Sequence, residues 1–138
     1  MSSLHFLDTN VLLYSISRHP DELAKREKAV ALLDLDNGAL SVQVLQEFYV
    51  QATRASRQDA IPHATATGLI RTWMRFKIQD NTASILLHAL ELKADHGFSY
   101  WDSAIIAAAR ALGCQELYSE DLTHGREAEG VLICNPFR

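Results

Sequence analysis

Four acidic side chains stand where the surrounding sequence is apolar or where a predicted element ends. Asp8 and Asp121 each come just after a short apolar run that is typical of a buried strand. Glu47 shares the apolar stripe of a predicted helix, and Asp102 lies in the first turn of another. A buried carboxylate is costly unless it has a partner. Ligands of parallel α/β sheets gather at the carboxyl ends of the strands, so we expect these acids to meet there.

Carboxylates that converge in this way need a counter-charge. Two of them about 4 Å apart repel by about 4 kcal/mol at an effective dielectric constant of about 20. Either some protonate or a cation binds. Oxygen ligands without clustered His or Cys favour a hard ion, Mg²⁺ or Mn²⁺. Such ions bind phosphate oxygens, which points to phosphoryl chemistry.

Each acid, taken alone, also has a purely structural explanation. Asp8 could cap a helix, and Asp102 fits the capping box S-x-x-D. Glu47 could pair with Arg54 or another base, and Asp121 could be an ordinary turn residue. The functional hypothesis therefore rests on the four positions together.

Short apolar strands alternate with helices along the chain, which predicts an α/β fold with a parallel sheet. Strands are expected at residues 4–7, 39–40, 76–78, 116–119 and 131–134. Helices are expected at about residues 11–16, 20–35, 42–52, 62–76, 82–96 and 99–112. The polar stretch 53–62 is expected to join two helices of a protruding hairpin.

The length and composition indicate one domain over residues 1–138 with a sizeable core, because 48% of residues are hydrophobic. A net charge of -4 argues against a general nucleic-acid coat protein but not against a nuclease with an acidic metal site. We find no signal peptide and no apolar run long enough for a membrane, so a cytoplasmic protein is expected. Cys114 and Cys134 are expected to be unpaired thiols.

The chain resembles the PIN-domain family, and in particular the VapC-type ribonuclease toxins of type II toxin–antitoxin systems. The resemblance covers essentially the whole chain, in order and spacing. It is carried by FLDTNVLLY (residues 6–14), SVQVLQEFYV (residues 41–50), SYWDSAIIAAA (residues 99–109) and LYSEDLTHG (residues 117–125).

The resemblance implies a three-layer fold in which a central parallel sheet of four or five short strands is flanked by about six helices, with the first and fourth strands adjacent. It implies that Mg²⁺ (or Mn²⁺) binds at the four acids. It also implies residues that orient the carboxylates or a substrate phosphate. The catalytic and metal-binding set is Asp8, Glu47, Asp102 and Asp121, and the orienting set is Thr9, Asn10 and Ser119.

The activity implied is that of a Mg²⁺-dependent endoribonuclease, the toxin of a toxin–antitoxin pair. It would cut structured RNA, in tRNA or ribosomal RNA loops, by metal-activated water. The implied partners are a second copy in a homodimer and a small antitoxin with a basic tail. Trp73 and Trp101 are expected in the core or a dimer interface, and His124, three residues after Asp121, is the one histidine that could touch the substrate. Candidate phosphate contacts, each by itself typical of a solvated charge, are Arg18, Arg54, Arg57, Arg71, Arg75 and Lys77.

Three alternatives stay open at this point. The chain could be a non-catalytic PIN-fold module that binds RNA or protein. It could be a haloacid-dehalogenase-like phosphatase with Asp8 as nucleophile, although Asn10 stands where that family has a second Asp. Its substrate could also be DNA, as for flap endonucleases, which are longer and carry more acids.

Overall fold

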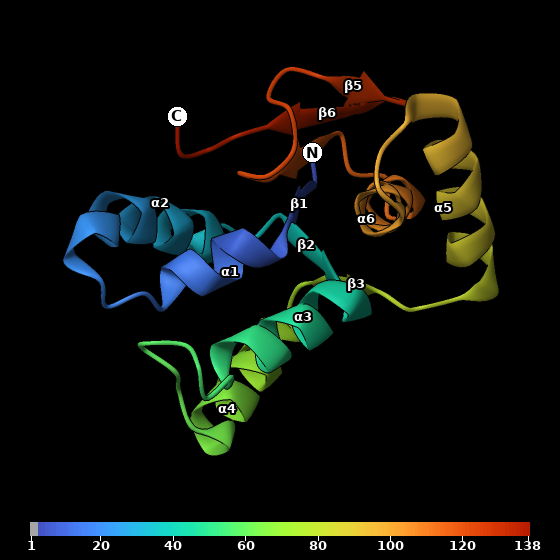
Figure 1. Cartoon of the computed structure of the whole chain (residues 1–138). Helices are drawn as coiled ribbons and strands as arrows, with labels where there is room; N and C mark the ends of the chain where they lie inside the picture. Colours follow the sequence, from blue (N-terminus) through green and yellow to red (C-terminus); the bar gives the residue numbers. More distant parts are fainter. Residues whose placement is uncertain (1–2) are drawn as a thin grey trace.

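A computed structural model describes residues 3–138, in which one twisted sheet lies between two groups of helices (Figure 1). The strands are β1 (His5–Leu7), β2 (Gly38–Ser41), β3 (Lys77–Gln79), β4 (Glu116–Tyr118), β5 (Glu127–Ala128) and β6 (Val131–Cys134). The helices are α1 (Thr9–Ser15), the 3-10 turn η1 (Pro20–Glu22), α2 (Leu23–Asp34), α3 (Val42–Ala52), α4 (His63–Trp73), α5 (Ala83–His96) and α6 (Tyr100–Ala111).

The strand order is β3-β2-β1-β4-β6-β5, and every neighbouring pair except β5–β6 is parallel. The first and fourth strands are adjacent, as predicted, with His5 opposite Glu116 and Leu7 opposite Tyr118. The chain first builds the sheet outward from β1 to β3 and then returns to build the other half from β4. The crevice beyond the carboxyl ends of β1 and β4 is therefore the switch point where such sheets bind ligands.

The predicted three layers are confirmed. Helices α1 and α2 cover one face of the sheet, and α5 and α6 cover the other (Figure 1). Helix α6 contacts β2, β3, β4 and β6 on one side and α5 on the other. Its residues 103–109 are all buried, because a run rich in alanine lets the helix lie close to both neighbours.

Helix boundaries follow capping residues. The hydroxyls of Ser41, Thr82 and Ser99 each accept a hydrogen bond from the backbone N–H three residues later. Gly97, at φ 76°, ends α5 in the left-handed conformation that glycine adopts without strain. These local signals explain why the predicted helices and the observed ones agree within a few residues.

The sheet has one strand more than predicted. Strand β5 is antiparallel to β6, with Ala128 opposite Val131. The two residues between them, Glu129 and Gly130, have φ values of 50° and 88°, as in a tight two-residue hairpin turn. A strand of only two residues carries no periodicity, so the sequence analysis placed none there.

Helices α3 and α4 pair as the predicted hairpin, which extends from the lower end of the molecule (Figure 1). The rings of Phe48 and Trp73 meet edge to face, 4.8 Å apart, and hold the two helices together. The connection between the helices closes with a hydrogen bond of 2.9 Å from the Ile61 N–H to the Ala52 carbonyl.

Two further predictions can be compared with the structure. Cys114 and Cys134 are both free thiols, as expected. Within residues 3–138, no helix combines the length and the apolar character that a membrane crossing requires.

Candidate active site

An open pocket of about 330 Å³ lies at the switch point of the sheet. All four acids singled out from the sequence line it, together with two acids that were not. The acidic lining residues are Asp8, Glu22, Glu47, Asp102, Glu120 and Asp121.

Asp8 is the buried centre of this pocket, with only 5% of its surface exposed. It follows β1 directly and caps α1, since its Oδ1 accepts a hydrogen bond of 2.7 Å from the Thr9 N–H. Its Oδ2 accepts another, also of 2.7 Å, from the Ser119 hydroxyl. Burial raises the pKa of Asp8 to about 6, although these two hydrogen bonds act in the opposite direction, and the charges of Glu47 and Asp121 raise it further. The capping explanation is thus correct, but it leaves Oδ2 directed to the loop after β4.

Glu47 reaches the pocket from α3, where it is half-buried. Its Oε2 accepts a hydrogen bond of 2.9 Å from the Thr9 hydroxyl, and its Oε1 accepts one of 3.1 Å from the Gln43 side chain. Thr9 therefore touches both acids, Asp8 through its backbone and Glu47 through its side chain. The alternative pairing of Glu47 with Arg54 does not occur among residues 3–138.

Asp102 enters from the first turn of α6. Its backbone N–H donates to the Ser99 hydroxyl at 3.1 Å, so the predicted cap is present, while the carboxylate lines the pocket. Burial raises the pKa of Asp102, the hydrogen bond with Ser99 opposes this, and the charges of Asp121 and Glu47 add to the increase. The acids are therefore close enough to affect one another.

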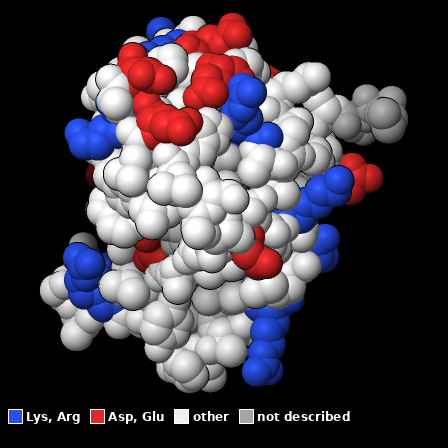
Figure 2. All heavy atoms as spheres, turned by 90° about the vertical axis from the view of Figure 1, so that its right-hand side faces the viewer, with Lys and Arg blue, Asp and Glu red and all other residues white. Residues whose placement is uncertain are grey.

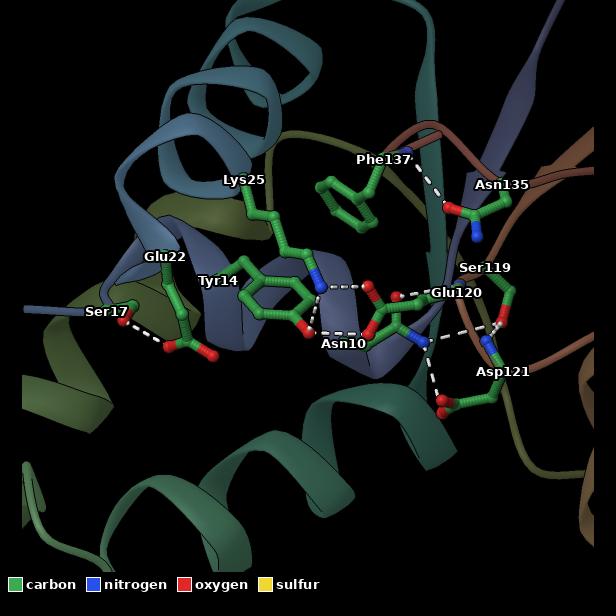
Figure 3. A network of polar contacts seen from close by, with 10 residues as sticks. All are labelled: Asn10, Tyr14, Ser17, Glu22, Lys25, Ser119, Glu120, Asp121, Asn135 and Phe137. Atoms are coloured by element: carbon green, nitrogen blue, oxygen red, sulfur yellow. Dashed lines mark hydrogen bonds and ion pairs between the residues drawn. The ribbon is translucent and has the colours of Figure 1, made fainter. Parts of the chain in front are cut away.

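Asp121 is exposed and is held at the pocket by side chains from α1 and the loop after β4 (Figure 3). Asn10 donates from Nδ2 to Asp121 at 3.2 Å, and its Oδ1 accepts from the Glu120 N–H at 3.3 Å. The Ser119 hydroxyl donates to Asp8 and accepts from the Asp121 N–H at 3.2 Å. The residues predicted to orient the acids are thus hydrogen-bonded to them.

Glu120, the chain neighbour of Asp121, is held by partners of its own. Its carboxylate accepts hydrogen bonds from the Tyr14 hydroxyl and from the Lys25 ammonium, the latter at 2.6 Å (Figure 3). Burial alone would raise the pKa of Glu120, but the bonds from Lys25 and Tyr14 hold it below its usual range. Because Lys25 is 95 residues away along the chain, no local signal in the sequence could have revealed this pair.

The pocket residues fit a hard divalent ion. Within the described part of the chain, no three metal-ligating side chains already form a cage around one point. Mg²⁺ does not require such a cage, because it keeps several waters and binds one or two carboxylates. A buried Asp8 with a raised pKa, beside further carboxylates and without His or Cys in the lining, has the donor chemistry that this ion prefers.

The candidate phosphate contacts divide into different groups. Arg57 lines the pocket, whereas Arg18 and Arg54 line neighbouring hollows. Arg75 donates to the Leu33 and Thr72 carbonyls and stacks on Phe76, so its role is structural. Arg71 and Lys77 are exposed.

The two tryptophans differ, although the sequence analysis grouped them. Trp73 is buried in the core, as expected. Trp101 is 62% exposed and lines the pocket, so a core position is wrong for this residue. His124 accepts a hydrogen bond of 2.9 Å from the Asn135 N–H and is not among the pocket residues.

Known structures of similar fold are numerous, and several come from toxin–antitoxin systems. A toxin–antitoxin complex from Klebsiella pneumoniae superposes with a TM-score of 0.68 at 19% identity, covering 96% of this chain and 97% of the other. VapC20 from Mycobacterium tuberculosis, described as a Sarcin-Ricin loop cleaving toxin, gives 0.66 at 22% identity, with 85% and 91% covered. VapBC2 from Rickettsia felis, bound to a fragment of its promoter DNA, gives 0.65 at 19% identity, with 94% and 96% covered.

Sequence comparison adds the family assignment. No curated protein matches the chain. Residues 5–127, however, match the PIN domain family, and this span contains β1, the switch point and all four predicted acids. The chain therefore belongs to the PIN domain family.

Proposed function

We propose that the protein is a Mg²⁺- or Mn²⁺-dependent endoribonuclease, the toxin of a toxin–antitoxin pair. The observation that carries this proposal is the buried Asp8 carboxylate, which shares one pocket with Glu47, Asp102 and Asp121 at the switch point of a PIN fold. A carboxylate that is buried in spite of the free-energy cost of desolvation, and that lies in an open polar pocket, is typical of a functional site.

Within this proposal, Asp8, Asp102 and Asp121 are the residues that would hold the ion, some of them through water. When bound, the ion lowers the pKa of water and offsets negative charge that develops on the phosphate. Glu47 positions or deprotonates the attacking water, or helps to hold a second ion. The Thr9 hydroxyl donates a hydrogen bond to Glu47 Oε2 and so holds the Glu47 carboxylate beside Asp8.

Asn10 and Ser119 complete the arrangement as orienting residues. The Ser119 hydroxyl donates to Asp8 and accepts from the Asp121 backbone, and Asn10 donates to the Asp121 side chain. Such contacts around a metal ligand fix its direction. Hydrolysis at this site is proposed to leave 5′-phosphate and 3′-hydroxyl ends.

Structured RNA, in tRNA or ribosomal RNA loops, is the proposed substrate. The structural similarity to VapC20, which is described as cleaving the Sarcin-Ricin loop, supports this choice. Bases that are unstacked in loops are accessible to proteins in a way that duplex bases are not.

The proposed protein partners are a small antitoxin with a basic tail and a second copy of the chain, in the cytoplasm. Similarity to toxin–antitoxin complexes supports the first of these. Besides Glu120, which is paired with Lys25, five carboxylates line the pocket and could attract an Arg or Lys of the antitoxin. They are those of Asp8, Glu22, Glu47, Asp102 and Asp121. Charge complementarity of this kind favours binding of the basic side chain in the pocket, where it would compete with the metal ion.

Cleavage assays test the proposal. The purified protein is incubated with total tRNA and ribosomal RNA in Mn²⁺, Mg²⁺ or EDTA. We expect metal-dependent cleavage that Asp8→Asn abolishes and that the exposed control Asp36→Asn retains. RNA binding without cleavage in either metal would instead support the non-catalytic PIN-fold module, and cleavage of DNA alone would contradict RNA as the substrate.

A further inference from the structure

We infer that Arg57 is a substrate-binding residue, whose guanidinium binds a backbone phosphate of the RNA strand in the acidic pocket. The inference rests on the proposed function and deepens it, because it identifies the group that holds the substrate rather than the ion.

Arg57 is unusual because of the charges around it. Among the described residues that line the pocket, it is the one basic side chain, and it faces six acidic ones. A fixed positive charge weakens the binding of a divalent ion to the same pocket. If the pocket bound only a metal ion, its affinity for that ion would be higher without the guanidinium. An anion that touches both the ion and the guanidinium makes the two charges compatible, and a phosphodiester is such an anion.

The position of Arg57 is held by its own loop. In the connection between α3 and α4, the Arg57 N–H donates to the Arg54 carbonyl and the Ala60 N–H donates to the Arg57 carbonyl, at 3.0 and 3.3 Å. The loop then closes onto the end of α3 through Ile61 and Ala52. The side chain thus starts from a fixed backbone.

Asp59 orients the guanidinium. Its Oδ1 accepts from the Arg57 Nε at 3.0 Å, and its Oδ2 accepts from the Arg18 backbone N–H at 3.4 Å, which joins the two loops on this side of the pocket. The side chains of Arg57 and Asp59 are only 25% and 22% exposed. Asp59 engages Nε, and among residues 3–138 the two terminal amino groups make no hydrogen bond within the protein. They can therefore form the paired hydrogen bonds with which arginine recognises phosphate.

The other basic residue near the pocket is already committed. The Lys25 ammonium bonds to both Glu120 and Tyr14, which uses two of its three donors. Arg57 is also ion-paired, with Asp59, but through one of its five donors. Arg57 therefore has the charge, the fixed position and the available donors that a substrate phosphate requires.

The test compares RNA binding with metal binding in the full chain. KM is measured for one RNA that the wild type cleaves, at saturating Mn²⁺, and the Kd of Mn²⁺ alone is measured by isothermal titration calorimetry. For Arg57→Gln we expect KM to rise about tenfold or more, as for loss of a charge-assisted hydrogen bond. The Kd of Mn²⁺ should stay equal or decrease, because a repulsive charge has been removed. Arg26→Gln, an exposed position on α2, changes the net charge equally and should alter neither value.

A higher KM for RNA together with an unchanged or lower Kd for Mn²⁺ separates substrate binding from a structural role. An equal loss of RNA and Mn²⁺ affinity, or an unchanged KM, would overturn the inference. If Arg57→Gln fails to fold by circular dichroism, Arg57→Lys keeps the charge without the planar fork and should still raise KM several-fold. Failure of the proposed function would look different, since the wild type itself would then not cleave RNA in a metal- and Asp8-dependent way.

Discussion

Asp8 combines two roles at the scale of a single residue. Its Oδ1 completes the N-terminus of α1, and its Oδ2 joins α1 to the loop after β4 through Ser119. Burial of the group disfavours its charge, which is why its pKa lies near 6. Asp8, which is central to the proposed chemistry, therefore lowers the stability of the fold when it is ionised, because its charge is buried.

This cost predicts a pH dependence of stability for the metal-free protein. The pKa of Asp8 is about 6 in the folded protein and about 3.9 in an unfolded chain, so folding takes up a proton between these values. Its contribution to stability is fully present below pH 4 and is lost as the pH rises through 6. The difference of about two units corresponds to about 3 kcal/mol.

Urea unfolding in EDTA at pH 4 and pH 7.5 measures the effect. We expect Asp8→Asn to be more stable than the wild type at pH 7.5 by up to about 3 kcal/mol, and the two to be nearly equal at pH 4. Asparagine carries no charge and can still accept from the Thr9 N–H, although the Ser119 hydroxyl loses the carboxylate oxygen to which it donates. The control Asp36→Asn should show no such pH-dependent gain. A variant less stable than the wild type at both pH values would contradict the prediction.

The sequence could indicate the four acids but not how they are held. Asp8 and Asp121 were found from strand ends, and Glu47 and Asp102 from apolar helices, because these are local patterns. The Thr9–Glu47 and Asn10–Asp121 hydrogen bonds join residues far apart in the chain, so their geometry depends on packing that local patterns do not describe. That the acids bind a metal and act in catalysis stays a prediction.

At the scale of elements, the loop after β4 is held in place from α1 and α2. Tyr14 and Lys25 bind Glu120, and Asn10 binds Asp121 (Figure 3). The two neighbouring acids thus point to different partners. Glu120 is neutralised by the helices, and Asp121 is left for the pocket.

Removing the Lys25 contact should therefore affect metal binding more than stability. Loss of the Lys25 charge by itself favours a cation in the pocket, but the loop that carries Asp121 also loses its contact with α2. For Lys25→Met we expect the displacement of Asp121 to outweigh the charge effect and the Kd of Mn²⁺ to rise about tenfold. The free energy of unfolding should fall by only about 1 kcal/mol or less, since the ion pair is partly exposed. Isothermal titration calorimetry and urea unfolding give the two values.

A conservative exchange and a neighbouring lysine serve as controls for this prediction. Lys25→Arg keeps a donor for Glu120 and should restore most of the affinity. Lys28→Met, on the exposed side of the same helix, should bind Mn²⁺ like the wild type. Normal affinity in Lys25→Met would show that the loop holds Asp121 without this contact.

The elements themselves were predicted well where they carry periodicity or caps. All six helices and the five parallel strands lie within a few residues of their expected places. Strand β5 was missed because its two residues form a strand only by pairing with β6. Its hairpin tip is fixed by distant contacts, since Glu129 bonds to His88 of α5 and its carbonyl accepts from Arg110 of α6.

At the scale of the whole molecule, metal binding should stabilise the fold. An ion that binds only the folded protein adds about 2.7 kcal/mol when its concentration is one hundred times the Kd. For a chain of this size we expect the melting temperature to rise by several degrees in Mn²⁺ or Mg²⁺. Differential scanning fluorimetry against EDTA measures the shift.

The same variants that remove ligands should remove this shift. Asp102→Asn and Asp8→Asn are expected to melt at the same temperature with and without Mn²⁺. For Asp8→Asn this temperature should exceed that of the metal-free wild type at pH 7.5, for the reason given above. If neither ion changes the melting of the wild type, the assignment of Asp8 and Asp102 as metal ligands loses its support.

The outer side of α5 is an exposed apolar surface, which we expect to be covered by a protein partner. Leu86, Leu87 and Leu90 are 46%, 61% and 49% exposed and form one stripe, while Ala89 and Leu92 of the same helix are buried. Figure 2 shows that the middle of this face carries few charged side chains, with most of them at its margins. Exposed apolar stripes of this kind mark interfaces, and a second copy of the chain is the partner that the sequence analysis expects.

A dimer through α5 makes a definite prediction for mass in solution. Size-exclusion chromatography with light scattering should give twice the monomer mass of 15.4 kDa for the wild type. The double variant Leu87→Glu/Leu90→Glu should give the monomer, because two carboxylates facing their symmetry mates would be desolvated and repelled. Val30→Glu, at an exposed apolar position on α2, should remain dimeric.

Since the two leucines lie outside the residues that line the acidic pocket, a folded monomer should still bind Mn²⁺ with the wild-type Kd. A wild type of monomer mass, or a double variant that stays dimeric, would rule out this face as the interface.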